Sequence, residues 1–265
     1  MKQQLIIRNI LAILGLTLVL SGCVTREYVT GTDNIDTERV IDTEHAAMAR
    51  LKLAIEYLRQ NQPAAAKQNL DRAAALNDSI DGIQSSYAYY YQKVGEDVKA
   101  NKAYQRAVNQ FPDNSNIRNN YGAFLCGLKR YSQAQQQFIA AINTESNSQV
   151  AQTHENAALC ALRAKNWAAA QTHFTVVLKY EPYRARAMLG LAKAEIHLNK
   201  PDQAKQALTK YRKMYALTPE SIWLNILLEH SQNNQAMVTT LGYLLVSKFP
   251  TSTASADYLA KNFDE

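Results

Sequence analysis

The residues of this chain that could perform chemistry are three cysteines and five histidines. No histidine belongs to an H-E-x-x-H motif or pairs with a cysteine at zinc-finger spacing, so we expect surface or core histidines and no metal site. The sequence also lacks G-x-S-x-G, S-x-x-K and a glycine-rich phosphate loop. We therefore predict no enzymatic activity, no cofactor and no small-molecule substrate. The histidines are His45, His154, His173, His197 and His230.

The first cysteine, Cys23, ends a segment whose order of residue types is typical of a secretory signal peptide. Lys2 and Arg8 come first, an apolar stretch of about 11 residues follows, and small residues precede the cysteine. A helix needs about 20 apolar residues to span a bilayer, so the stretch predicts a signal peptide, residues 1–22, rather than a membrane span. Cys23 is then either a residue modified at the cleavage site or an incidental cysteine after an ordinary signal peptide.

The residues Leu20-Ser21-Gly22-Cys23 resemble the lipobox of bacterial lipoproteins, L-[AS]-[GA]-C. The resemblance implies that Cys23 receives N-acyl and S-diacylglycerol groups and becomes the first residue of the mature chain. It also implies export to the outer membrane, because Val24 rather than aspartate follows the cysteine. Each buried methylene contributes about 0.8 kcal/mol, so several acyl chains anchor a protein almost permanently. We expect the mature chain to be held at the periplasmic face of the outer membrane.

Beyond Cys23 the sequence repeats with a period of 34 residues, with two extra residues before the fourth unit. Small residues recur at unit positions 8 and 20, as Ala54 and Ala66 do in the first unit, and bulky residues recur at position 24. This pattern is typical of the tetratricopeptide repeat, a pair of antiparallel helices, and the scarcity of glycine and proline also favours helices. An unrelated helical bundle is the alternative. We predict an all-α fold, a right-handed superhelical α-solenoid of six units at 47–80, 81–114, 115–150, 151–184, 185–218 and 219–252.

The two ends of the predicted solenoid differ from its middle. Residues 23–46 are mostly polar, so we expect the lipidated cysteine to be followed by a flexible tether. In the sixth unit Ile226, Val238 and Gly242 replace the expected residue types, which predicts a degenerate, capping repeat. Residues 253–265 form a C-terminal tail, for which we expect a short helical lid.

The two remaining cysteines, Cys126 and Cys160, fall in the first helices of the third and fourth units. Consecutive first helices are neighbours in a solenoid, and the periplasm is oxidising, so we favour a disulfide between them. Closing a loop of about 35 residues would stabilise the fold by about 3–4 kcal/mol in the chain-entropy model. The alternative is two separate buried thiols that pack as small apolar groups.

A partner groove is expected on the concave face, where unit positions 2, 5, 9 and 12 point. In the first unit all four positions are apolar, and an aromatic residue extends the row in the second unit. Each buried leucine or isoleucine contributes about 1.5–3 kcal/mol, so the row could hold an amphipathic helix. Residues 24–44 folding back over the groove, or a second copy of the chain, are the alternatives. The groove residues are Met48, Leu51, Ile55, Leu58 and Tyr89.

Charge excludes one class of partner. The formal net charge is +6, but the basic residues are scattered, without a run or a patch that alternates with aromatic residues. A nucleic-acid-binding protein normally shows such a patch. We therefore expect a protein partner rather than a nucleic acid.

The stretches "ARLKLAIEYLRQNQPAAAKQNLDRAAALND", "NNYGAFLCGLKRYSQAQQQFIAAI" and "ENAALCALRAKNWAAAQTHFTVVLKYEP", together with the lipobox, resemble the type IV pilus biogenesis lipoproteins of the PilF/PilW family, the pilotins of the secretin PilQ. The similarity runs from about residue 45 to 252. It implies binding of the secretin subunit and promotion of its outer-membrane localisation and multimerisation, hence pilus biogenesis and twitching motility. The alternative is a scaffold of another envelope assembly, similar to BamD in barrel insertion, to TadD in pilus assembly, or to adaptors of peptidoglycan hydrolases.

Overall fold

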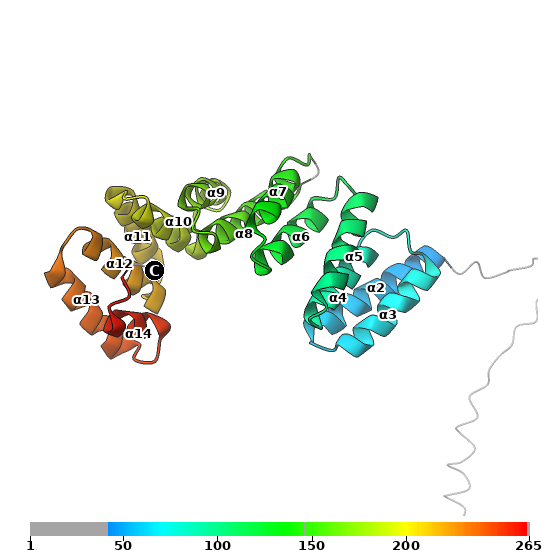
Figure 1. Ribbon diagram of the computed structural model, residues 1–265, viewed down its shortest axis with the longest axis horizontal. Helices are drawn as coiled ribbons and strands as arrows, with labels where there is room; N and C mark the ends of the chain where they lie inside the picture. The colour runs from blue at the N-terminus through cyan, green and yellow to red at the C-terminus, as the bar shows by residue number, and fades with distance from the viewer. Residues whose placement is uncertain (1–41, 146, 264–265) are drawn as a thin grey trace, which may run out of the picture. The chain divides into compact units, whose positions relative to one another are not determined.

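The computed structural model describes residues 42–145 and 147–263, and these residues form thirteen helices and no strand (Figure 1). The all-α prediction is therefore confirmed. Twelve helices form six hairpins: α2 (Thr43–Arg59) with α3 (Pro63–Leu76), α4 (Ile83–Lys93) with α5 (Asp97–Gln110), α6 (Ser115–Gly127) with α7 (Tyr131–Ile142), α8 (Val150–Arg163) with α9 (Trp167–Tyr180), α10 (Ala185–His197) with α11 (Pro201–Met214), and α12 (Pro219–Ser231) with α13 (Gln235–Lys248). A last helix, α14 (Thr253–Ala260), follows. The signal peptide, Cys23 and most of the tether lie outside the described residues.

The first helix begins earlier than the repeat period predicts. Helix α2 starts at Thr43, whereas the predicted first unit starts at Ala47 and the predicted tether reaches Ala46. Asp42 causes the early start, because its side chain accepts a hydrogen bond of 3.0 Å from the backbone N–H of His45. A capping carboxylate satisfies one of the free N–H groups at a helix start. The tether boundary at residue 46 is thus wrong by one helical turn.

Small residues allow the two helices of each hairpin to approach. Ala54 and Ala66, at unit positions 8 and 20, are fully buried. Where Gly122 takes position 8, a Cβ atom would lie 2.8 Å from the ring of Phe138 on the partner helix, so only glycine leaves room for this phenylalanine. Phe138 is itself fully buried.

Each hairpin turns at the same unit position, 15, through one residue in the left-handed backbone region. The φ angles of these residues lie between 53° and 77°. Glycine and asparagine adopt this region at low energetic cost, but two of the six turns use lysine. The turn residues are Asn61, Gly95, Lys129, Lys165, Asn199 and Asn233.

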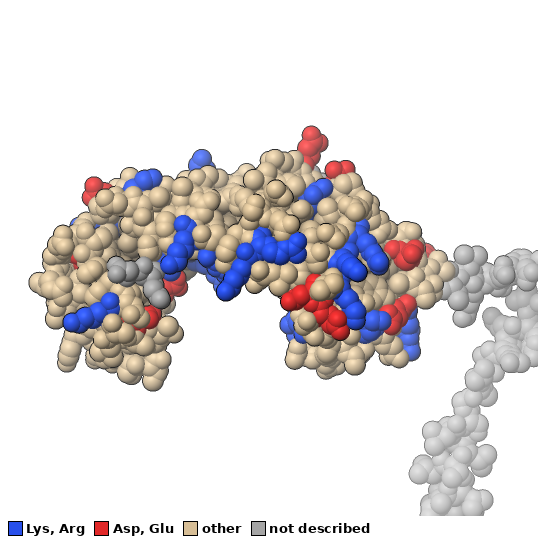
Figure 2. All heavy atoms as spheres, viewed as in Figure 1, with Lys and Arg blue, Asp and Glu red and all other residues tan. Residues whose placement is uncertain are grey.

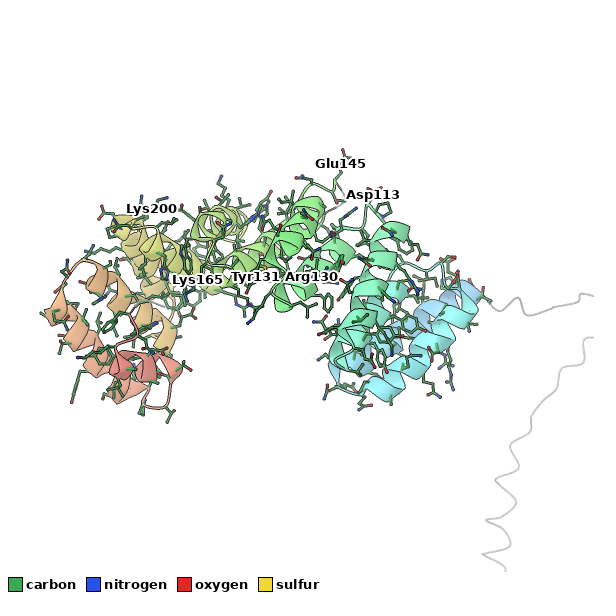
Figure 3. The ribbon with its side chains drawn as sticks, in the orientation of Figure 1. Asp113, Arg130, Tyr131, Glu145, Lys165 and Lys200 are labelled. Carbon is green, nitrogen blue, oxygen red and sulfur yellow. A yellow bond between two sulfur atoms is a disulfide. The ribbon has the colours of Figure 1, made fainter. Side chains whose placement is uncertain are left out.

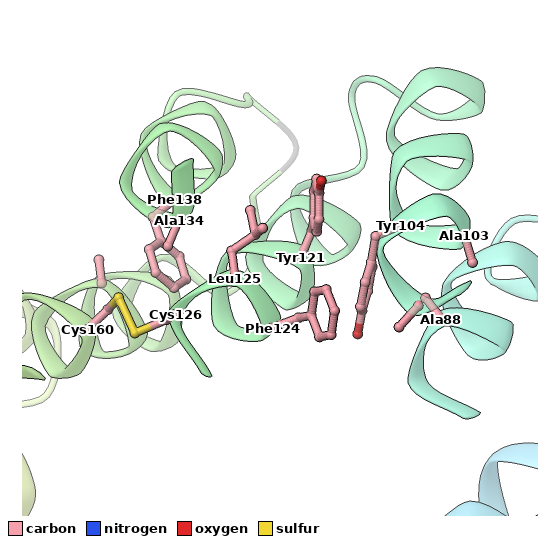
Figure 4. Close-up of a cluster of buried hydrophobic side chains, with 12 residues drawn as sticks. Ala88, Ala103, Tyr104, Tyr121, Phe124, Leu125, Cys126, Ala134, Phe138 and Cys160 are labelled. Atoms are coloured by element: carbon pink, nitrogen blue, oxygen red, sulfur yellow. A yellow bond between two sulfur atoms is a disulfide. The ribbon is translucent and has the colours of Figure 1, made fainter. Parts of the chain in front are cut away.

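Successive hairpins pack through shared cores. Between the second and third hairpins, the ring of Tyr104 lies 5.3 Å from that of Tyr121 and 5.2 Å from that of Phe124 (Figure 4). The hydroxyl of Tyr121 and the guanidinium of Arg130 both donate to the side-chain oxygen of Asn101, each at 3.0 Å. The junction therefore combines aromatic packing with a satisfied polar contact.

The last hairpin is closed by α14. A Cβ atom on Gly242 would lie 1.8 Å from the ring of Tyr258, so this glycine in α13 allows α14 to pack directly on the helix. Ile226 and Val238, which replace small residues, are buried in the same core with Leu245. The short helix lies where a further repeat would otherwise begin.

Candidate interaction surface

The structure separates the residues assigned to the partner groove. Leu51 and Leu58 are only 8% and 1% exposed. Leu51 packs in a buried cluster with Ile80, which precedes α4, and with Ile83, the first residue of α4. The prediction that these two leucines contact a partner is wrong, because α3 and α4 both pack against α2 and keep the side chains from the surface.

Two of the assigned residues in α2 remain accessible. Met48 is 42% exposed and Ile55 is half-buried, while Lys52 and Arg59 are exposed. These four positions recur at intervals of three to four residues, so they share one face of α2. The sequence prediction missed the two cations, although the same helical spacing would have identified them. This face is therefore apolar and basic rather than wholly apolar.

Tyr89 continues this face on the next hairpin. It is half-buried on α4 and occupies the same unit position as Ile55, and α2 contacts α4. The Nζ atom of Lys93 lies 5.6 Å from the centre of the Tyr89 ring, a favourable cation–π distance. We call the six residues of this face the inner surface: Met48, Lys52, Ile55, Arg59, Tyr89 and Lys93.

Cys126 and Cys160 are joined by a disulfide between α6 and α8 (Figure 4). Their Cα atoms are 5.8 Å apart, and both residues are 4% exposed. The bond links the third hairpin to the fourth, and it lies inside the protein rather than in a reactive, open position. The two cysteines therefore form a structural disulfide.

A buried ion pair links the fourth and fifth hairpins. The guanidinium of Arg184 donates two hydrogen bonds to the carboxylate of Glu155, at 2.6 and 2.9 Å, and one to Glu181 at 2.6 Å. The Glu155 side chain is 1% exposed and that of Arg184 is 27% exposed. The hydrogen bonds that Arg184 donates to Glu155 and then to Glu181 raise the pKa of Arg184. Because the buried carboxylate has this single cationic partner in the described residues, the pair fixes the junction between the two hairpins.

Two of the histidines, His154 and His173, pack against each other. The Nδ1 atoms of His154 and His173 lie 2.9 Å apart, and Gln135 Nε2 lies 3.3 Å from His173 Nε2. Burial, and then the neighbouring His154, lowers the pKa of His173 to about 4, and burial lowers the pKa of His154. Both rings are neutral at pH 7, so one ring N–H donates to the other ring. Over the described residues, no group of three or more potential metal ligands comes together.

Charged residues of the middle hairpins lie at two different edges. Arg130 and Lys165 lie at the turns inside hairpins, whereas Asp113 and Glu145 lie in the connections between hairpins (Figure 3). The Arg130 side chain is used inside the molecule, where it binds Asn101. Among the described helices, none combines the length and hydropathy needed to span a membrane.

Comparisons with known proteins first define the class. Models of the tetratricopeptide repeat match residues 103–136 and 161–223, so the chain is a tetratricopeptide-repeat protein and its hairpins form an α-solenoid of that kind. It is 41% identical over 125 residues to an uncharacterized protein of Haemophilus influenzae, a match that covers 47% of this chain and 70% of that protein. It is 25% identical over 247 residues to the type IV pilus assembly protein PilF of Pseudomonas aeruginosa, which covers 93% of this chain and 96% of PilF.

Solved structures share the fold over most of this chain. The structure of Pseudomonas aeruginosa PilF has a TM-score of 0.70 at 23% identity and covers 83% of this chain and 99% of that one. The structure of PilW, described as a widely conserved type IV pilus biogenesis factor, also has a TM-score of 0.70, at 22% identity, and covers 80% and 98% of the two chains. The chain is thus similar to the type IV pilus protein PilF over nearly its whole length, and it shares the tetratricopeptide-repeat fold of PilF and PilW.

Proposed function

We propose that this chain is a lipid-anchored pilotin of the outer membrane. It binds the secretin subunit of a type IV pilus system and promotes the localisation and multimerisation of that subunit in the outer membrane, hence pilus biogenesis and twitching motility. The observation that carries the proposal is the similarity to PilF, which extends over 93% of this chain and 96% of that protein. A generic repeat protein would be expected to match over the repeats alone.

The anchor and the repeats have separate tasks in this proposal. Acyl chains on Cys23 set the destination, since several buried chains hold a protein at a membrane almost permanently. The helical hairpins then bind the secretin, and the protein catalyses no reaction. Cys126, Cys160, Glu155 and His173 are buried, so these groups serve the packing of the array and lie away from any surface that a partner contacts.

The inner surface is the proposed site of secretin binding. Met48, Ile55 and Tyr89 supply the apolar contacts, and burial of such a side chain contributes about 1.5–3 kcal/mol. The cations beside them favour a partner segment that carries acidic residues next to its apolar ones. An amphipathic helix with one acidic border meets both requirements.

Co-purification with the secretin subunit tests this site. Replacing Met48→Asp and Ile55→Asp together should abolish capture of the secretin, because two carboxylates would enter the apolar contact. Leu53→Asp is the matched control, since Leu53 is 45% exposed on a different face of α2 and its replacement should leave capture unchanged. Undiminished capture by the double variant would refute the inner-surface assignment, and no capture by the unaltered protein would refute the proposed function.

The anchor has its own test. A Cys23→Ser protein should still capture the secretin in solution but should fail to bring it to the outer-membrane fraction. Mass spectrometry of the purified unaltered protein should show an acylated N-terminal cysteine. A Cys23→Ser strain with normal secretin localisation would contradict the delivery role.

A further inference from the structure

The first two hairpins carry a second groove, on the other side of α4 from the inner surface. The groove has a volume of about 340 Å³ and lies between α3 and α5, with α4 beneath it. Tyr87 and Tyr91 of α4 line it, whereas Tyr89 belongs to the inner surface. Residues two apart on a helix point about 200° apart, so the tyrosines of α4 serve two separate surfaces. We call this groove the outer groove.

The α3 side of the outer groove is ordered by a carboxylate. Asp71 accepts hydrogen bonds from Lys67 Nζ, at 2.6 and 2.8 Å, and from the hydroxyl of Tyr87 at 2.7 Å. The Lys67 Nζ atom also lies 5.6 Å from the centre of the Tyr87 ring. Desolvation, followed by the hydrogen bond to Asp71, raises the pKa of the Tyr87 hydroxyl, so the ring stays neutral and uncharged at the floor of the groove. Asp71 is the one acidic residue that lines the outer groove.

The α5 side is a row of cations. Lys99, Lys102 and Arg106 stand three and four residues apart and so share one face of α5. Lys99 pairs with Glu96 at 3.2 Å and lies 5.8 Å from the centre of the Tyr91 ring. In the described part of the chain, Lys102 and Arg106 form no ion pair. Figure 2 shows basic side chains over α4 and α5, with a group of acidic side chains next to them.

We propose that the outer groove binds an extended, acidic segment of a partner protein. Four cations and one carboxylate line the groove, and that carboxylate is already bonded to Lys67 and Tyr87, so the groove favours added negative charge. The three cations of α5 span about 10 Å along the helix axis, which an extended peptide covers in three to four residues. Tyrosine rings between the two cationic sides provide flat apolar contact for its backbone.

The position of the charges favours a peptide over a membrane surface. Lys99 is exposed, whereas the side chain of Lys67 is 36% exposed and lies against the Tyr87 ring at the floor of the outer groove, so a ligand has to enter the groove to reach Lys67. A single chain can do so, whereas a flat lipid surface meets only charges that project outward. The outer groove lies apart from the inner surface and does not depend on the proposed secretin contact.

Fluorescence anisotropy with the full-length protein and a labelled peptide, Glu-Ser-Glu-Ser-Glu-Ser-Glu-Ser, tests the proposal. Replacing Lys102→Glu and Arg106→Glu should weaken binding at least about tenfold, because two charge-assisted contacts become repulsive. The matched control is Lys205→Glu with Lys210→Glu on α11, which makes the same change of net charge at another exposed basic site. The control should change the dissociation constant by less than about twofold.

Three outcomes would overturn the proposal. The first is no binding of the peptide at low salt, and the second is equal weakening by both double variants, which would show non-specific attraction to a basic protein. The third comes from sedimentation with phosphatidylglycerol vesicles: loss of vesicle binding in the Lys102 and Arg106 variant, with peptide binding unchanged, would assign these cations to lipid. Melting temperatures of both variants within a few degrees of the unaltered protein exclude misfolding as the cause of any loss.

Discussion

Removing the guanidinium of Arg184 should destabilise the middle of the array more than any surface substitution. In an Arg184→Met variant the side-chain volume is largely kept, but Glu155 loses both of its charge-assisted hydrogen bonds. Its carboxylate would stay in a site where the side chain is 1% exposed. A buried charge without a partner is strongly unfavourable, whereas the pair itself contributes little net stability.

The magnitude depends on the two bonds and their burial. Hydrogen bonds to charged groups contribute about 1.5–3 kcal/mol each, and breaking one side of a buried pair destabilises proteins by about 3–5 kcal/mol. Because the Arg184 side chain is 27% exposed, water reaches part of the site, and the lower end, about 3 kcal/mol, is expected. The double variant Arg184→Met with Glu155→Gln should recover a large part of the loss, since no buried charge is then left unpaired and Glu181, which also loses Arg184, is 44% exposed.

Urea unfolding followed by circular dichroism in the far ultraviolet measures this loss. The matched control is Arg59→Met, whose side chain is 72% exposed and pairs with Glu56 at 3.7 Å. Exposed pairs of this kind contribute little, so the control should leave the unfolding midpoint almost unchanged. If Arg184→Met shifts the midpoint no further than Arg59→Met, the reasoning about the buried pair is refuted.

Three further predictions concern the disulfide, the C-terminal helix and the buried histidine. Replacing Cys126 and Cys160 by alanine should lower the unfolding free energy by about 3–4 kcal/mol, as should reductant on the unaltered protein, because a loop of sequence separation 34 is opened. Gly242→Ala should displace α14, since its Cβ atom would overlap the ring of Tyr258, and faster proteolysis of the C-terminus would report this. Stability should fall by roughly 2–4 kcal/mol from pH 6.5 to pH 4, because the folded-state pKa of His173 is depressed to about 4 and the unfolded chain binds the proton first. His173→Asn should reduce that fall in thermal melts across this range.

Each of these predictions has a result that would contradict it. Reductant should have no effect on the alanine variant, and a further loss there would assign the effect to something other than the disulfide. Gly127→Ala is the control for Gly242→Ala, because no atom lies within 4 Å of a Cβ built at Gly127. Equal rates of proteolysis of the two variants would contradict the claim that Gly242 is needed for α14 to pack on α13. An unchanged pH dependence in His173→Asn would assign the acid sensitivity to other groups.

The repeat period predicted the hairpins because it reports packing that recurs in every unit. Ala54 and Ala66 are buried where the period places small residues, and the left-handed turn residues all fall at unit position 15, a regularity that the sequence carries but that the motif positions alone do not single out. The start of α2 was missed because it depends on one capping side chain, Asp42, outside the period.

The partner surface was predicted less well, for a physical reason. The helical register predicts the direction in which Leu51 and Leu58 point within a unit. It does not predict that the following helices bury these side chains. The Arg184–Glu155 pair joins residues 29 apart in the sequence and has no periodic signal. The outer groove likewise arises from two helices that meet only in the fold, so neither Lys102 nor Arg106 stands out in the sequence.

The most direct test of the pilotin proposal is to measure secretin multimers in a strain that lacks this protein. Outer-membrane fractions of the deletion strain and of a complemented strain should be compared for secretin multimers that resist SDS. The proposal predicts that the multimers are lost from the outer membrane on deletion and return on complementation. Multimers retained at the normal level in the outer membrane would contradict it.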